Sequence, residues 1–115
     1  MSAVLERAMA HFSAQERQSI IVPEWGDEGK PLIIYFAAMS VFQKRRIYKP
    51  GTRPSDDPSI QVDAVIEMAQ TEDGKQLFTL DDREKLLREV DARVVRRVAT
   101  AIFSASLGAE QVEKN

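Results

Sequence analysis

The chain has no cysteine and only one histidine among its 115 residues. The first absence excludes a disulfide framework, a thiolate nucleophile and a thiolate metal site. The histidine, His11, has no neighbours at metal-ligand spacing, so we expect no metal site there. A serine or threonine nucleophile would have this imidazole as its only candidate base. The sequence therefore predicts a protein that is not an enzyme and carries no cofactor.

Long apolar runs are missing as well. The longest, residues 32–39, is far shorter than the roughly 20 residues that span a bilayer. Residues 1–12 are amphipathic and lack the continuous apolar core of a signal peptide. Glycines are few, and Gly26 and Gly29 do not fit a phosphate-binding loop. We expect a soluble cytoplasmic protein with no membrane partner.

Charge of one sign does not dominate, since 16 basic and 18 acidic residues give a formal net charge of −2. This balance is not typical of a nucleic-acid binder. One basic stretch, residues 44–49, lies at the end of a predicted helix, where cations complement the helix dipole. We interpret it as a solvated helix end that could dock an acidic partner. The alternative is a small DNA-binding regulator that uses residues 44–53.

The residues that are present indicate one globular domain over 1–115, with 43 % apolar and 30 % charged residues. Apolar spacing and turn signals predict an α+β fold, mainly α-helical, with four to five helices and one N-terminal β-hairpin. The hairpin strands are expected at about 19–25 and 31–36, and the helices at 3–13, 41–48, 59–70 and within 80–106. The last region is either one bent helix or two helices separated at Asp91.

Local signals support these boundaries. Ser2 is placed to cap the first helix, and Ser40 with Gln43 forms a capping-box pattern. Pro23 favours an edge position for the first strand. The proline-rich segment 49–58 predicts an exposed, mobile loop. Gly108 is expected to end the last helix, with a frayed tail over 109–115.

Trp25 is the only tryptophan, and it follows Pro23-Glu24 and precedes Gly26. We expect it to close the hairpin against a helix, although tryptophan is also common among interface anchors. Leu77 and Phe78 form a short extended pair after the turn Thr71–Gly74, and we expect them to anchor that segment in the core.

Two segments, taken in order, indicate a family. The first is Val22-Pro23-Glu24-Trp25-Gly26, and the second is Asp73-Gly74-Lys75-Gln76-Leu77-Phe78-Thr79. Over about residues 15–108, this order resembles the tail assembly chaperones of lambda-like long-tailed bacteriophages and their prophage relatives. In that family a Val-Pro-Glu-Trp-Gly-like strand and an Asp-Gly-x-x-Leu-Phe segment recur in this arrangement. The chain departs from the pattern in its more apolar second strand and in the insertion-like loop 50–58.

The resemblance implies a chaperone without catalytic activity. Such proteins bind the tape measure protein, keep it soluble, help to recruit tail tube subunits and are absent from the mature virion. They also form ring-like or spiral homo-oligomers. A rival reading is a structural minor tail or head–tail joining protein. The motif residues are expected to build the scaffold, so partner contacts are predicted elsewhere, at Lys44, Arg45, Arg46, Tyr48, Lys49, Leu32 and Ile34.

Overall fold

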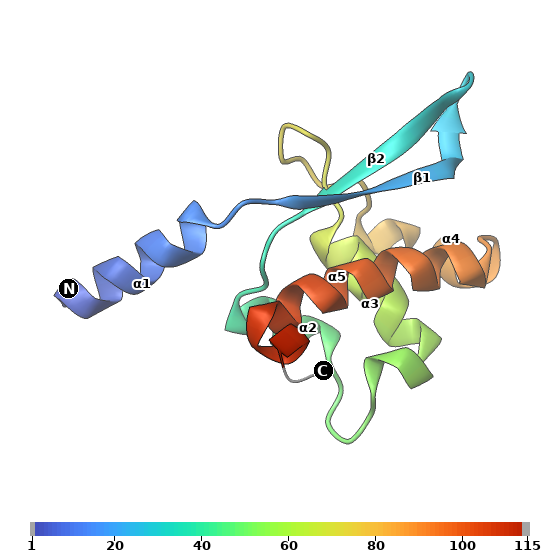
Figure 1. The fold of residues 1–115 in the computed structure, drawn as a ribbon. Coiled ribbons are helices and arrows are strands. Elements are labelled where there is room, and N and C mark those ends of the chain that lie inside the picture. The colour runs from blue at the N-terminus through green and yellow to red at the C-terminus, as the bar shows by residue number, and fades with distance from the viewer. Residues whose placement is uncertain (1, 114–115) are drawn as a thin grey trace.

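The computed structural model describes residues 2–113, and the side chains of residues 2–105. Within this range the chain forms five α-helices, two short 3-10 helices and one two-stranded antiparallel sheet (Figure 1). The predicted α+β, mainly helical fold is confirmed. The elements follow in the order α1 (Ala3–Ala14), β1 (Gln18–Asp27), β2 (Lys30–Phe36), α2 (Val41–Ile47), η1 (Pro54–Asp56), α3 (Pro58–Met68), η2 (Leu80–Asp82), α4 (Arg83–Arg88) and α5 (Ala92–Glu113).

Strands β1 and β2 form the predicted hairpin, in a register that pairs Ile20 with Ile34 and Ile21 with Ile33. Because side chains alternate along a strand, Ile34 is fully buried while its neighbour Ile33 points outward. The turn places Glu28 and Gly29 at positive φ, 47° and 78°. One face of the hairpin therefore covers the helical core, and the other faces outward.

Helix α3 lies at the centre of the core. Seven of its 11 residues are buried, and α2, α4 and α5 pack around it. A helix that is apolar on most sides must be covered on most sides. The hairpin covers the core through inward-facing side chains of both strands. The fully buried large side chains are Phe36, Ile34, Ile47, Ile60, Met68, Ile102, Val22, Val65 and Val98.

Side-chain caps fix where the helices begin. Ser2 Oγ accepts a hydrogen bond from the Leu5 N–H (3.0 Å), and the predicted capping box of Ser40 and Gln43 is present, at 3.2 and 2.9 Å. Asp91 Oδ1 accepts from the Arg93 N–H (2.8 Å). This cap begins α5 after α4 has ended at Arg88, so residues 80–106 form two α-helices and not one.

The predicted end of the last helix at Gly108 is wrong, because the helical backbone of α5 continues to Glu113. A glycine inside a helix costs only about 1 kcal/mol, which good helix formers on either side can offset. The fraying of the tail stays a prediction, and residues 114–115 lie outside the described range. The proline-rich loop contains η1, and Pro58 is the first residue of α3, as its fixed φ favours.

Helix α1 stands apart from the rest of the fold. Figure 1 shows it extending beyond the hairpin, and none of its described residues is buried. It begins at the predicted residue and ends one residue beyond the predicted range 3–13, and none of its residues belongs to the core of the described chain. None of the described helices has the length and apolar character needed to cross a membrane.

Candidate partner-binding surfaces

The two motif segments meet in space. The ring of Trp25, near the end of β1, packs edge-to-face against the ring of Phe78, with centroids 5.9 Å apart and planes at 79°. The Leu77 N–H donates to the carbonyl oxygen of Ala69 (3.1 Å), which holds this segment beside the end of α3. Gln70 exchanges two backbone hydrogen bonds with Tyr35 on β2, at 2.8 and 2.9 Å. The second motif is therefore fastened to the hairpin that carries the first.

Around these two rings lies an open apolar hollow of about 350 Å³, called here the Trp25 groove. Most of its lining side chains are half-buried, packed against the core on one side and open on the other. Its lining residues are Trp25, Leu32, Leu77, Phe78, Leu86 and Val90. Leu86 and Val90 also line a smaller adjoining hollow with Leu87, so the apolar surface continues past α4.

An ion pair fixes the strand beside this groove. The carboxylate of Glu24 accepts hydrogen bonds from both terminal nitrogens of Arg97 on α5, at 2.6 and 2.9 Å. This bidentate contact is the main reason that the pKa of Glu24 falls to about 2. The role of the pair is thus structural, because it holds the motif strand to a core helix.

A second exposed surface lies on α2. Val41 and Phe42 are 76 % and 66 % exposed, and the next turn presents Lys44 and Arg45 to solvent. The structure gives neither Lys44 nor Arg45 an ion pair among the described residues. These four side chains, called here the α2 face, combine apolar contact area with uncompensated positive charge.

The other basic residues predicted to contact a partner, Arg46 and Lys49, interact with residues of this chain. Arg46 pairs with Glu67 on α3 (3.1 Å), and its guanidinium lies over the Phe42 ring at 5.6 Å. Lys49 lies 3.6 Å from the carboxylate of Asp57 and donates to Ser59 Oγ (3.0 Å). These pairs secure α2 and the following loop against α3, so the basic stretch presents less free charge than its sequence indicates.

The two apolar residues predicted to contact a partner, Leu32 and Ile34, lie in different environments. Leu32 is half-buried and lines the Trp25 groove, whereas Ile34 is fully buried in the core. The Ile34 side chain therefore does not reach the surface, because it belongs to the inward-facing set of β2. Tyr48 is half-buried and packs edge-to-face on Phe103, with ring centroids 5.6 Å apart.

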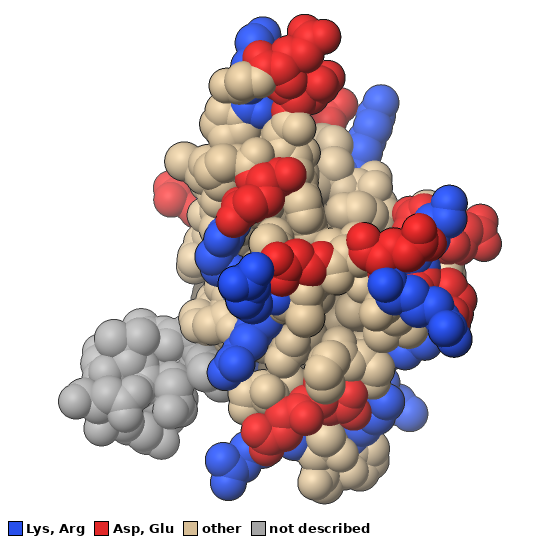
Figure 2. All heavy atoms as spheres, turned by 90° about the vertical axis from the view of Figure 1, so that its right-hand side faces the viewer, with Lys and Arg blue, Asp and Glu red and all other residues tan. Residues whose placement is uncertain are grey.

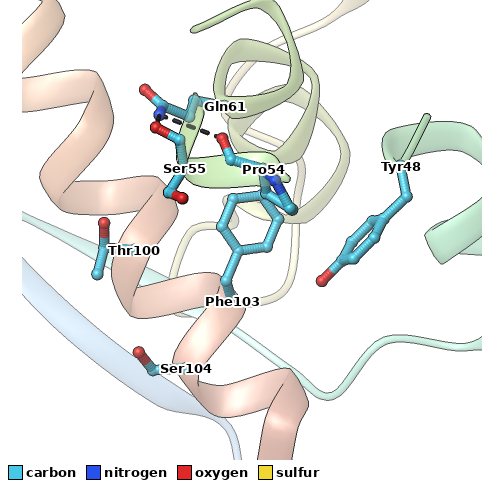
Figure 3. A pocket seen from close by; sticks show the side chains of 7 residues that line it. All are labelled: Tyr48, Pro54, Ser55, Gln61, Thr100, Phe103 and Ser104. Carbon is cyan, nitrogen blue, oxygen red and sulfur yellow. Dashed lines mark hydrogen bonds between the residues drawn. The ribbon is translucent and has the colours of Figure 1, made fainter. Parts of the chain in front are cut away.

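Tyr48 and Phe103 are the walls of a separate cavity of about 270 Å³ between α2, η1, α3 and α5 (Figure 3). Gln61 donates from Nε2 to the carbonyl oxygens of Pro54 and Ser55, at 3.3 and 3.4 Å, and so ties η1 to α3. The lining has no carboxylate, imidazole or amine that could transfer a proton. Its full lining is Tyr48, Pro54, Ser55, Gln61, Thr100, Phe103 and Ser104.

The charges on the surface are mixed. Figure 2 shows acidic and basic side chains interleaved over the face that it presents, with residues of other kinds between them. No group of three or more potential metal ligands occurs in the described part of the chain. His11 is exposed on α1, where its Nδ1 lies 3.4 Å from Gln15 Nε2.

Sequence reasoning missed two of these surfaces. The apolar spacing of α1 predicts a helix, but it does not reveal that no element of the described chain buries its side chains. Val41 and Phe42 follow the Ser40 cap directly, and one apolar pair at a helix start does not tell which side faces the core. Their exposure depends on the direction in which Ile47 anchors α2 to the core, which is a tertiary property.

No protein-family model matches the chain, and no curated protein matches it. Among solved structures, the chain is similar to one described as "Structure of bacteriophage HK97 tail assembly chaperone". The two are 18 % identical, the match covers 89 % of this chain and 99 % of the other, and the TM-score is 0.49.

Proposed function

We propose that this chain is a tail assembly chaperone of a long-tailed bacteriophage or prophage, without catalytic activity. It acts in the host cytoplasm, binds the tape measure protein transiently, keeps it soluble and helps to recruit tail tube subunits. It is absent from the finished virion. The observation that carries the proposal is the contact between the two motifs, since Trp25 and Phe78 are distant in sequence but form one packed unit. The two segments that carry the resemblance therefore belong to one packed unit of this chain.

The α2 face is the proposed binding site for the client. A tape measure protein is long and helical, and an amphipathic helix binds through apolar side chains repeated along one side. Val41 and Phe42 would contact that side, while Lys44 and Arg45 would lie beside acidic residues at its border. A contact made by four side chains is much smaller than a stable protein–protein interface. Such a contact suits a chaperone that must release its client.

The charge pattern argues against the alternative of a DNA-binding regulator. Arg46 and Lys49 are paired with carboxylates of α3 and its preceding loop, so they are less available to phosphates. A structural virion protein is the stronger alternative, because its contact surfaces could look the same. These two functions differ in the fate of the protein after assembly, which is measurable.

Co-expression tests the proposal. The gene should lie next to a long tape-measure-like reading frame, and the two proteins should be produced together in the same cell. We expect the wild-type chain to increase the soluble fraction of the tape measure protein several-fold. The double variant Val41→Asp/Phe42→Asp should lose this effect because it places charge in the apolar contact. An unchanged soluble fraction with the wild-type chain would contradict the proposal.

Two controls make the test specific to the α2 face. Val4→Asp introduces a negative charge at an exposed apolar residue of α1, which stands apart from α2, and should retain the solubilising effect. Lys44→Ala/Arg45→Ala should weaken binding more at low salt than at high salt, because these side chains contribute through charge. All variants should keep the wild-type melting temperature, since none of the substituted side chains is buried.

A further inference from the structure

Strand β1 has one edge with which no described element pairs. On the other strand, the backbone N–H and C=O of Tyr35 bond to Gln70, at 2.9 and 2.8 Å, so they point away from β1. Tyr35 therefore faces Ser19 as a non-hydrogen-bonded pair, and such pairs alternate along an antiparallel ladder. The next is Ile21 with Ile33. The backbone groups of Ser19 and Ile21 consequently point out from the free edge of β1.

The outer edge of β2 is largely closed. The loop after α3 lies beside it (Figure 1), and Gln70, at the start of this loop, occupies the position next to Tyr35. Pro31 has no N–H to donate. Among the described residues of β2, this leaves Ile33 with both backbone groups free on that side. Of the two edges of the hairpin, only that of β1 offers two suitable residues in succession.

The open edge of β1 spans residues 18–22. Proteins protect exposed strand edges with prolines, charges and bulges. In β1 these features occur only beyond Val22, where Pro23 follows and the pairing is irregular before Asp27. Residues 18–22 contain neither a charge nor a proline. An edge in this state favours pairing with another extended chain.

The outer face beside this edge is suited to apolar side chains. Ile21 is 57 % exposed and Ile33 is 40 % exposed, and the two lie opposite each other across the strands. The strand residues that share this face, Ser19, Ile21, Pro31, Ile33 and Tyr35, are all uncharged. A strand added to β1 would extend this face and place its own alternate side chains next to Ile21.

The charges at the ends of the edge favour a partner other than a second copy. Glu16 is exposed just before β1 and has no ion pair among the described residues. A basic residue at the end of a partner segment would complement it. A second β1 strand does not supply one, because Glu16 and Glu24 flank it and Arg17 donates to the carbonyl oxygens of Thr71 and Glu72.

Independently of the function proposed above, we propose that the free edge of β1 binds an extended segment of a different protein by strand addition. The backbone of the segment pairs with Ser19 and Ile21, its apolar side chains lie beside Ile21 and Ile33, and a basic residue lies beside Glu16. The contact makes few hydrogen bonds and orders a flexible segment, so it is weak and reversible. It differs in kind from the α2 face, which fits a helix.

Hydrogen exchange followed by NMR tests whether the edge is free in the full chain. The N–H groups of Ile20 and Val22 lie in the β1–β2 ladder and should exchange at least about tenfold more slowly than those of Ser19 and Ile21. Equal protection of all four amides would overturn the proposal. So would protection of Ser19 and Ile21 that rises with protein concentration, because a second copy would then cover the edge.

A synthetic peptide tests the recognition. The probe has the sequence KTVTVTK with blocked ends, so it alternates valine with threonine and carries a lysine at each end. In an NMR titration of the full chain, we expect saturable shifts centred on residues 16–22 and slower exchange of the Ser19 and Ile21 amides. The absence of a saturable shift at about 1 mM peptide would overturn the proposal.

N-methylated peptides are the matched controls for strand addition. One version is methylated at both valine nitrogens and the other at the two threonine nitrogens that follow the valines. Only alternate N–H groups of an added strand face its neighbour. One version should therefore bind like the parent peptide, and the other should bind at least about tenfold more weakly. Equal affinities of the two versions would overturn the proposal.

A pair of proline variants tests the edge from the side of the protein. Ile21→Pro removes an N–H that faces the free edge, leaves the β1–β2 ladder intact and should weaken peptide binding at least about tenfold. Ile33→Pro makes the same change at the opposite edge and should bind the peptide like the wild type. Wild-type affinity in Ile21→Pro would overturn the proposal.

Tryptophan fluorescence checks that both proline variants are folded. If Ile21→Pro does not fold, the comparison of the N-methylated peptides decides, since it uses the unaltered chain. The solubility test on the α2 face is separate, so either proposal can fail without the other.

Discussion

Glu24 of β1 and Arg97 of α5 form a bidentate ion pair, with their closest atoms, Oε1 and Nη2, 2.6 Å apart. The pair joins residues that are 73 positions apart in sequence and lies one residue before Trp25. It therefore couples the position of the first motif to the longest helix of the fold. Because the pair holds the carboxylate ionised, its effect can be measured by titration.

The first prediction concerns pH. The pKa of Glu24 falls from an ordinary value of 4.5 to about 2, mainly through the Arg97 hydrogen bond. A depressed pKa means that the contribution to stability is complete above about pH 4.5 and is lost as the pH falls towards 2. Carboxylate titration by NMR should give a Glu24 midpoint near 2 in the wild type and a midpoint raised towards 4.5 in Arg97→Ala, where only the backbone hydrogen bond of Glu24 still lowers its pKa.

Arg88→Ala is the control for this titration. Arg88 forms an exposed pair with Glu84 on α4 and does not contact Glu24. It should leave the Glu24 midpoint unchanged. If the midpoint in the wild type is close to 4.5, the ion pair does not persist in solution.

The second prediction uses two adjacent isoleucines on β2. Ile34→Ala removes a fully buried side chain and should lower the free energy of unfolding by about 2–5 kcal/mol. Ile33→Ala changes a side chain that is 40 % exposed and should cost about 1 kcal/mol or less. Urea unfolding, followed by the fluorescence of the single tryptophan, measures both. Equal losses of unfolding free energy would mean that the side chains of β2 do not alternate between the core and solvent.

The third prediction concerns the glycine that ends the first motif. A Cβ built on Gly26 would lie 2.0 Å from the carbonyl oxygen of Lys30, which is backbone and cannot move aside easily. Gly26→Ala should therefore lower the free energy of unfolding by about 3 kcal/mol. A Cβ on Gly29 would meet no atom within 4 Å, so Gly29→Ala should lower the free energy of unfolding only by the cost of a positive φ, about 1 kcal/mol. Chemical denaturation of both variants checks this order, and the reverse order would contradict the hairpin geometry.

The fourth prediction concerns Asp63 on α3 and Arg83 on α4. Their closest atoms are 2.7 Å apart, a second contact lies at 3.4 Å, and both side chains are partly buried. A partly buried ion pair contributes more interaction free energy than an exposed one, provided that its hydrogen bonds are made. A double-mutant cycle with alanine should give a coupling energy of about 1 kcal/mol, against about 0.3 kcal/mol for the exposed pair of Glu84 and Arg88. Equal coupling energies would contradict this difference.

Much of the fold could be predicted from the sequence because its signals are local. Ser2 and the Ser40–Gln43 box cap helices where expected, and Asp91 begins α5. The strand pattern around Pro23 gives the hairpin to within a few residues. The end at Gly108 was wrong because the propensity of the following residues outweighs one glycine.

The candidate surfaces were harder to predict, since they depend on what each residue meets in three dimensions. Arg46 and Lys49 look free in the sequence, but Glu67 and Asp57 approach them only when α2 packs on α3. Ile34 looks like part of an exposed edge, and its burial follows from which face of the hairpin packs on the helical core. The exposure of α1 has no sequence signal, because an amphipathic pattern predicts a partner without locating it.

The chaperone proposal is tested most directly by the fate of the protein during assembly. Quantitative mass spectrometry should compare cells that are assembling the phage with purified virions from the same culture. The account predicts that this chain is abundant in the assembling cells and absent from the virions, whereas tube and tape measure proteins are present in both. Stoichiometric recovery of the chain in purified virions would contradict the account and favour a structural tail protein.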